Sequence, residues 1–277
     1  MLSDFIVHPS LATKDVTMAR TWYATRLGLE PFLTSPSLLA YQIEASIFTV
    51  FETPAAGTAR NTVAVWRVRD LRADVARLAA RGVPFEELDF GADGHTVAGI
   101  MATADPEGSP VLNAWFRDGD GNWIGMVEQV DHPGEPAVGL GIGPSLAAAD
   151  LSRARSWYAD KLGLEPTRVY ENDELVYRIG RTHFTIYATP SAGTAKNTVA
   201  VWRVADVRSE VAALRARGVR FEDYDVGGIR TVDGIYAAPD GGELAAWFVD
   251  SEGNVIGLAE DPEGAIAPQS PRPAPNG

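Results

Sequence analysis

Residues 56–68 read AGTARNTVAVWRV, and residues 192–204 read AGTAKNTVAVWRV. The two stretches differ only in one cationic residue, which is Arg60 in the first and Lys196 in the second. Chance does not produce a match of this length, so the pair indicates an internal duplication. Its period is far longer than that of a solenoid repeat, so each copy is predicted to be a domain with its own core.

The duplication extends in both directions from this stretch. Three further pairs keep the same order at an offset of about 135 residues: WYATRLGLEP (22–31) with WYADKLGLEP (157–166), RGVPFE (81–86) with RGVRFE (217–222), and AWFRDGDGNWIG (114–125) with AWFVDSEGNVIG (246–257). We therefore expect a first domain over 1–130, a linker of turn formers over 131–136 and a second domain over 137–260. Residues 261–277 are rich in Pro and Gly, which predicts a disordered tail.

Each copy contains a smaller unit twice. A strand-like run leads to an Asp, then to an amphipathic helix, then to a Gly; the limits are Asp15 to Gly28, Asp70 to Gly82, Asp150 to Gly163, and Asp206 to Gly218. Asp accepts hydrogen bonds from the first turn of a helix, and Gly can end a helix in the left-handed conformation. Strand-like runs such as 38–43 and 47–51 follow each helix. Residues 118–122, DGDGN, predict a hairpin turn.

The fold class expected from these units is α+β. Two tandem domains would each consist of paired βαβββ modules that form a curled mixed sheet with the helices outside. The two domains are expected to pair within the chain, with a homodimer as the alternative.

Composition excludes several functional classes. The chain has no Cys, which removes disulfides, thiolate catalysis and thiolate metal sites. Its net charge of −13 disfavours nucleic acid and anionic membranes as partners. No apolar run approaches the roughly 20 residues that span a bilayer, and residues 1–4 lack the features of a signal peptide. We therefore expect a cytoplasmic protein whose partner is a small molecule, with no nucleic acid or membrane partner.

Paired βαβββ modules with a D-x-[DE]-G-N hairpin near the end of each copy resemble the vicinal oxygen chelate family. This family includes glyoxalases, bleomycin-resistance proteins and extradiol dioxygenases. The pattern Asp15…Trp22-Tyr23…Leu27-Gly28-Leu29 is similar to the first helix of that family, and the resemblance covers nearly all of the chain except the tail. It implies sheets curled into a cup that holds the ligand. In metal-dependent members, the cup also holds a divalent ion through His or Gln and Glu.

The resemblance also implies where metal ligands would lie, and this sequence lacks most of them. The three positions are His8, Val63 and Gly125 in copy one, and Gly143, Val199 and Gly257 in copy two. A single imidazole does not hold a catalytic ion, because such sites need about three protein ligands. Glu128 and Glu260 lie three residues further along a strand and should face away. We therefore expect neither a metal nor a cofactor.

Strand alternation sorts side chains between the cup and the core. It turns Trp66 and Trp202 towards the helices. The residues expected to line the cup are His8, Phe51, Arg67, Trp115, Trp123, His183, Tyr187, Arg203 and Trp247. Aromatic faces suit a flat or cationic organic molecule, and Arg suits a carboxylate or phenolate oxygen. Two other interpretations stay open: the Trp side chains simply fill the cup, and His8 caps the edge of a sheet.

Two functions of different classes follow. The first is a metal-free glyoxalase- or bleomycin-resistance-like protein that binds a small aromatic or hydrophobic molecule in an aromatic-walled cup. The second is a glyoxalase-like lyase, isomerase or dioxygenase. It would depend on a metal through His8, or use His183, Tyr187 or Arg203 as acid, base or oxyanion partner. The second copy could also serve only as a structural partner of the first. The sequence identifies neither the ligand, nor any catalytic residue, nor the copy that carries the site.

Overall fold

The computed structural model describes residues 6–91, 94–104, 108–128, 141–170, 174–180, 182–226, 229–238 and 244–260. The expected linker at 131–136 and the expected tail at 261–277 lie outside these ranges. Residues 1–4, on which the expectation about a signal peptide depends, lie outside them as well.

Copy one consists of two modules. The first contains β1 (Ile6–Thr13), α1 (Val16–Trp22) continued by a π-helical turn η2 (Tyr23–Leu27), β2 (Leu33–Thr34), β3 (Leu38–Ile43) and β4 (Ser46–Glu52). The second contains β5 (Thr62–Val68), α2 (Leu71–Ala80), β6 (Ile100–Ala104), β7 (Pro110–Arg117) and β8 (Trp123–Glu128).

Copy two repeats this order. The third module contains β9 (Gly141–Ala148), α3 (Leu151–Trp157) with η4 (Tyr158–Leu162), β10 (Arg168–Tyr170), β11 (Glu174–Ile179) and β12 (Thr182–Ala188). The fourth contains β13 (Thr198–Val204), α4 (Val207–Ala216), β14 (Asp225–Val226), β15 (Ile229–Val232), β16 (Ile235–Ala237), β17 (Leu244–Val249) and β18 (Val255–Glu260). The prediction of four βαβββ modules is confirmed, and the fourth carries additional short strands.

The helices begin and end at the residues that the sequence predicts. The carboxylate of Asp15 accepts hydrogen bonds from the amides of Thr17 and Met18, and the Asp before each of the other helices accepts one from the amide three residues on. Gly28 ends η2 with φ 73°, in the left-handed region that disfavours other residues.

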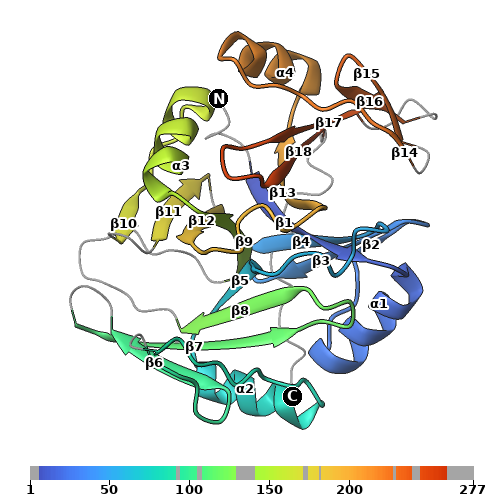
Figure 1. Cartoon of the computed structure of the whole chain (residues 1–277). Helices are drawn as coiled ribbons and strands as arrows, with labels where there is room; N and C mark the ends of the chain where they lie inside the picture. Colours follow the sequence, from blue (N-terminus) through green and yellow to red (C-terminus); the bar gives the residue numbers. More distant parts are fainter. Residues whose placement is uncertain are drawn as a thin grey trace.

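The modules pair between the copies. Strand β1 of the first module runs antiparallel to β13 of the fourth, and β5 of the second runs antiparallel to β9 of the third. The result is a ten-stranded sheet of order β14-β15-β16-β17-β18-β13-β1-β4-β3-β2, here called sheet 1, and an eight-stranded sheet of order β10-β11-β12-β9-β5-β8-β7-β6, sheet 2. The helices lie on the outside of both sheets (Figure 1). The α+β class with curled mixed sheets is confirmed, and each sheet takes one module from each copy.

Reciprocal contacts hold the two copies together. The amide of Val7 donates to Thr182 Oγ1 at 3.0 Å, and the amide of Ile142 donates to Ser46 Oγ at 2.6 Å. In the repeated loops, Arg60 N donates to Thr194 Oγ1 and Lys196 N donates to Thr58 Oγ1, both at 3.1 Å.

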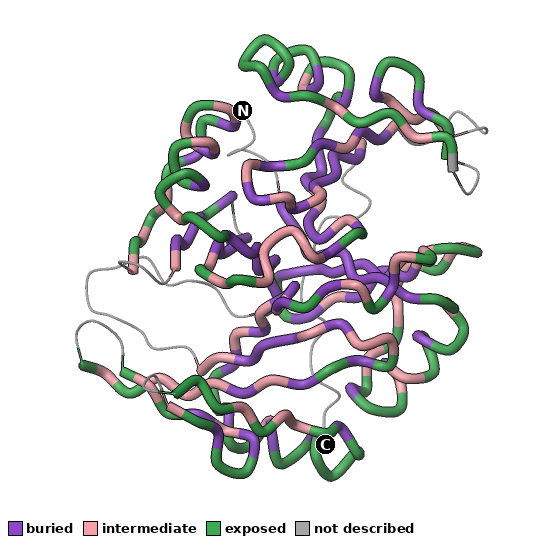
Figure 2. The backbone as a smooth tube through the Cα atoms, viewed as in Figure 1, coloured by how far each residue is buried: buried purple, intermediate pink, exposed green. Residues whose placement is uncertain are grey.

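One hydrophobic core contains buried residues from all four modules. Burial is concentrated in the strands, whereas the outer faces of the helices are exposed (Figure 2). Within the described ranges, no helix is long and apolar enough to cross a membrane.

Candidate ligand cups

The side of each sheet that faces away from its helices carries a row of four aligned residues. In sheet 1 the row contains His8, Val201, Gly257 and Trp247, on β1, β13, β18 and β17. In sheet 2 it contains Gly143, Val65, Gly125 and Trp115, on β9, β5, β8 and β7. These rows include four of the six positions at which the resemblance predicts metal ligands, namely His8, Gly143, Gly125 and Gly257. We call the two faces cup 1 and cup 2.

The placement of Val63 and Val199 in these rows was wrong by two residues. A bulge between Thr62 and Ala64, and its counterpart between Thr198 and Ala200, shifts the register of the strand. Val63 is only 1% exposed and packs in the core, whereas Val65 is aligned with Gly125. Strict alternation cannot reveal a bulge. The residue at the corrected position is again Val, so it still offers no metal ligand.

The imidazole of His8 is fully buried in cup 1 and bound on both nitrogens. Nε of Arg203 donates to Nε2 of His8 at 3.2 Å, so Nδ1 carries the proton and donates to the carbonyl of Pro9 at 3.0 Å. Burial, assisted by the charge of Arg203, lowers the pKa of His8 from 6.5 to about 3. His8 is therefore a neutral imidazole that orients a guanidinium group.

Cup 2 contains the same contact, built from a different position. Nε of Arg67 donates to Nε2 of His183 at 3.1 Å. Burial and the charge of Arg67 lower the pKa of His183 well below its usual value. His183 lies on β12, whereas the counterpart of His8 in copy two is Gly143. A Cβ atom on Gly143 would lie 2.9 Å from His183 Nε2 and 2.5 Å from its carbonyl oxygen, so this glycine leaves the room that the imidazole occupies.

The nine residues predicted to line a cup are divided between the sheets rather than between the copies. Cup 1 contains His8, Phe51, Arg203 and Trp247, and cup 2 contains Arg67, Trp115, Trp123, His183 and Tyr187. Sequence reasoning assigned each of these residues to the cup of its own copy. That assignment fails because β1 and β5 find their partners in the other copy.

Aromatic side chains from loops and short strands complete the walls. In cup 1, Tyr224 and Tyr236 flank Trp247 with ring centroids 5.6 Å and 6.4 Å away. In cup 2, Phe90 packs on Trp115 at 5.4 Å. Tyr224, Tyr236 and Phe90 were not predicted to line a cup, because they lie in segments where the two copies are least alike. The signal that could have found them is the presence of aromatic residues after the second helix of each copy.

Two predicted wall residues of cup 2 are engaged by neighbours. The guanidinium of Arg117 lies 4.1 Å from the centre of the Trp123 ring and also pairs with Glu86 at 3.1 Å. The hydroxyl of Tyr187 accepts a hydrogen bond from the amide of Thr62 at 2.8 Å. Burial raises the pKa of this hydroxyl. Tyr187 thus connects β12 to β5 across the two copies.

The two cups differ in polarity. Burial lowers the pKa of Arg67 in cup 2, and the negative charge of Glu174 opposes that shift. Strand pairing gives Leu38 as the counterpart of Glu174 and Leu33 as the counterpart of Arg168 in cup 1. Cup 1 therefore has apolar walls where cup 2 is charged.

The donor set of the cups does not fit a divalent ion. Across the described ranges, no three His, Asp or Glu side chains lie close enough to hold a metal. Glu128 and Glu260 face the helices, as alternation predicts: their carboxylates accept hydrogen bonds from the amides of Leu71 and Val207.

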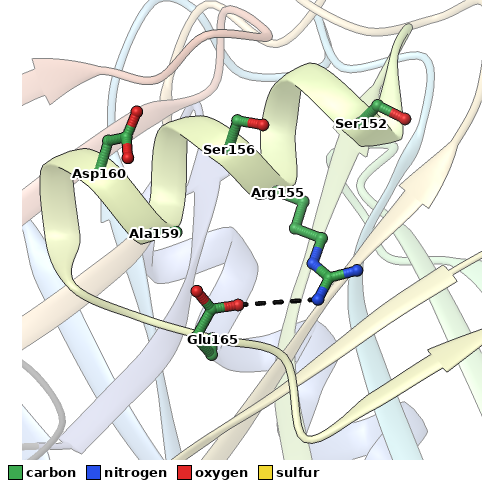
Figure 3. A pocket seen from close by; sticks show the side chains of 6 residues that line it. All are labelled: Ser152, Arg155, Ser156, Ala159, Asp160 and Glu165. Carbon is green, nitrogen blue, oxygen red and sulfur yellow. Dashed lines mark ion pairs between the residues drawn. The ribbon is translucent and has the colours of Figure 1, made fainter.

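A shallow depression lies away from both cups, on the exposed side of α3 and η4. Its lining includes Arg155 and Glu165, which pair at 3.9 Å (Figure 3). The equivalent pair Arg20 and Glu30 lies beside α1 at 3.6 Å. This surface pair is a repeated feature of the fold, and the depression contains none of the predicted site residues.

Comparison with known proteins adds the following findings. Residues 137–262 match the family described as the Glyoxalase/Bleomycin resistance protein/Dioxygenase superfamily. Glyoxalase I from Zea mays is similar in structure, with a TM-score of 0.59 at 15% identity over 93% of this chain and 92% of that chain. A proposed dioxygenase from Bacillus subtilis subsp. subtilis str. 168 has a TM-score of 0.55 at 18% identity, over 94% and 86%. No curated protein matches the sequence. At these identities the structural likeness shows the fold alone.

Proposed function

We propose that this chain, whose residues 137–262 match the Glyoxalase/Bleomycin resistance protein/Dioxygenase superfamily, binds a small aromatic or hydrophobic molecule in its aromatic-walled cups without a metal ion. One observation carries the proposal. In both cups, the imidazole nitrogen that could ligate a metal accepts a hydrogen bond from Arg203 or Arg67 instead. Nitrogen that accepts such a bond has no lone pair left for a metal.

The rest of each row supports the same proposal. A Cβ atom on Gly257 would lie 3.3 Å from Val201 Cγ2, 3.4 Å from Trp247 Nε1 and 3.5 Å from Thr198 Cγ2. The surroundings of this position are therefore two methyl groups and an indole edge. Such a surface favours the face of an organic molecule over an ion that needs oxygen or nitrogen ligands.

The proposal also covers the two duplicated units of the chain and the residues that form its binding surface. Residues 1–130 and 137–260 are the duplicated units, and the nine residues that line the cups form the binding surface. Both cups close within one chain, so a second chain is not needed to complete either one. The absence of cysteine suits the cytoplasm.

A Trp fluorescence titration tests the function. The probe is 2-naphthol, a flat aromatic molecule, added with and without EDTA. We expect saturable quenching that EDTA does not change, with the probe recovered chemically unaltered. Trp247→Leu should remove much of the quenching. Trp157→Leu is the matched control, because Trp157 stacks on Phe248 on the helix side of sheet 1. Absence of saturable quenching across a series of planar probes would contradict the proposal.

The alternative is an enzyme. Its metal-dependent form must break the contact between Arg203 and His8, and its metal-free form needs a group that exchanges protons near neutrality. The lowered pKa of His8 and His183 and the raised pKa of Tyr187 all oppose such exchange. Turnover abolished by a chelator would establish the metal-dependent form. Turnover that resists a chelator but is lost in His183→Ala would establish the other.

A further inference from the structure

We propose that cup 1 is the cup that holds the ligand, one molecule per chain, and that this ligand is a flat apolar ring system lying where cup 2 carries the indole of its own Trp123. This inference rests on the proposed function and names the cup and the class of ligand. The two cups are built from the same repeated strands, so each position in one cup has a counterpart in the other.

The first argument concerns the end of each cup next to the hairpin turn. In cup 2, Trp123 is aligned with Arg117, and the guanidinium lies 4.1 Å from the centre of the indole ring. The counterparts in cup 1 are Val255 and Val249, which are aligned in the same way. Val249 is 37% exposed. Cup 2 therefore covers this part of its face with its own ring and cation, whereas cup 1 leaves an apolar surface in contact with water.

Cup 2 also shows which kind of occupant fits this surface. Next to Trp123 lies the row of Val65, Gly125 and Trp115, and cup 1 repeats this row residue for residue. A surface that accommodates an indole in cup 2 is thus available in cup 1 to a ring of similar size from outside the chain. The row spans two strand spacings, or about 10 Å, which is wide enough for two fused rings. Burial of apolar area on both partners favours binding.

The second argument is the polarity of the neighbouring wall. Cup 2 has Glu174 aligned with Tyr187 on β11 and β12, where cup 1 has Leu38 aligned with Phe51 on β3 and β4. An apolar molecule laid against a charged side chain removes that side chain from water, which costs free energy. The same molecule laid against Leu38 and Phe51 buries apolar area instead, which is favourable. Cup 1 therefore suits an apolar ring better than cup 2 does.

The buried arginine of cup 1 lies away from this surface. Arg203 is 6% exposed, and its Nε is bound to His8. It is aligned with Ala259, four residues along β18 from Val255. Four residues of a strand amount to about 13 Å, so a ring next to Val255 leaves the contact between Arg203 and His8 in place.

Calorimetric titration of the full chain with 2-naphthol at neutral pH tests the cup and the stoichiometry. We expect one site per chain. Val255→Trp gives cup 1 the ring that cup 2 already carries and should weaken binding by about tenfold or more, because the added indole fills the site. Trp123→Val, the reverse change in cup 2, should leave this site unaltered. Val169→Trp is the matched control, because it adds the same ring at a position on β10 that is 41% exposed.

The apolar wall is tested by Leu38→Glu, which gives cup 1 the side chain that cup 2 has at this position. The affinity for 2-naphthol should fall by about tenfold, because the ring would then remove a carboxylate from water. Leu38→Met keeps the wall apolar and should change the affinity by less than about threefold. Leu38 lies at a partly exposed position outside the core, so this pair keeps the inference testable if Val255→Trp does not fold.

The possible outcomes separate this inference from the proposed function. Two equal sites on the unmodified chain would overturn the inference and leave the proposed function standing. A single site that Trp123→Val weakens and Val255→Trp leaves intact would overturn the assignment to cup 1. Unchanged affinity in Leu38→Glu would overturn the apolar match. Binding of neither 2-naphthol nor any other planar probe would contradict the proposed function itself.

Discussion

Gly143 and Gly257 both lie in the aligned rows, but the space around them differs. A Cβ atom on Gly143 would approach the carbonyl oxygen of His183 to 2.5 Å, which is backbone and cannot turn away. A Cβ atom on Gly257 meets its nearest neighbours at 3.3 Å to 3.5 Å. We expect Gly143→Ala to lower the free energy of unfolding by about 1–3 kcal/mol, and Gly257→Ala to lower it by less than about 1 kcal/mol. Urea denaturation of both variants measures this, and equal losses would contradict the packing described around His183.

The buried imidazoles predict a loss of stability on acidification. The pKa of His8 is about 3 in the folded chain and 6.5 in its ordinary state, so between these values the unfolded chain binds a proton that the folded chain does not. The free energy of unfolding therefore falls as the pH falls through this window, by about 1.4 kcal/mol per pH unit for one such group. The lowered pKa of His183 acts in the same direction.

His8→Gln should make this dependence shallower. Between about pH 6 and pH 5 the variant should lose about 1 kcal/mol less stability than the unmodified chain, measured by urea denaturation at each pH. Carboxylates that titrate nearby contribute equally to both proteins and cancel in the comparison. A parallel pair of curves would show that His8 titrates normally and is not the buried acceptor of Arg203.

Alternation along strands predicted individual residues well where the strands are regular. It turned Trp66 and Trp202 into the core and directed Glu128 and Glu260 away from the cups, as found. It failed at Val63 and Val199, because a bulge inserts one extra residue into the strand and no sequence pattern indicates where it occurs. The contact between Arg67 and His183 joins residues 116 apart, and no local pattern encodes it.

At the scale of the elements, the hairpin turns between β7 and β8 and between β17 and β18 bind the two modules of each copy to each other. The carboxylate of Asp118 accepts hydrogen bonds from the amides of Asp120 and Asn122 and, at 2.7 Å, from the hydroxyl of Tyr23. Asn122 Nδ2 donates to the carbonyl of Ala12 at 2.8 Å. The turn thereby fastens sheet 2 to the first module, which belongs to sheet 1. Asp250, Tyr158 and Asn254 repeat the arrangement in copy two.

Asp118→Ala should therefore be among the more destabilising single substitutions outside the core. It leaves a buried Tyr23 hydroxyl and two amides without their acceptor, so we expect a loss of about 2–4 kcal/mol in the free energy of unfolding. Tyr23→Phe removes one bond only and should cost about 1–2 kcal/mol. Asp74→Ala, at an exposed ion pair with Arg77, is the control and should cost less than about 0.5 kcal/mol. A loss in Asp118→Ala no larger than in that control would contradict the fastening role.

At the scale of the whole molecule, two kinds of contact link the four modules, one within each copy and one between the copies. The hairpin turns join modules of the same copy, whereas β1 with β13 and β5 with β9 join modules of different copies. The repeat in the sequence predicted the number and type of modules, and the resemblance predicted curled sheets. The sequence could not predict which modules pair with each other. All four modules present similar strand edges, and only the packing of the complete chain selects the partners.

This interlocking predicts that copy one alone is not a stable monomer. Residues 1–130 expressed without the remainder would expose the edges of β1 and β5, and exposed central strands associate or aggregate. Co-expression with residues 137–260 should restore a soluble one-to-one complex, which size-exclusion chromatography with light scattering would detect. A folded monomer of residues 1–130 would contradict the pairing between copies.

The central claim, made as our proposal, is that the cups bind their ligand without a metal ion. Elemental analysis of the chain purified without chelator, repeated after equilibration with Ni²⁺, Co²⁺, Fe²⁺ and Zn²⁺, tests it most directly. The contact between Arg203 and His8 and the row of Val, Gly and Trp predict a metal content near zero in every case. A content of about one tightly held metal per chain, lost in His8→Ala, would contradict the claim and make metal-dependent catalysis the leading interpretation.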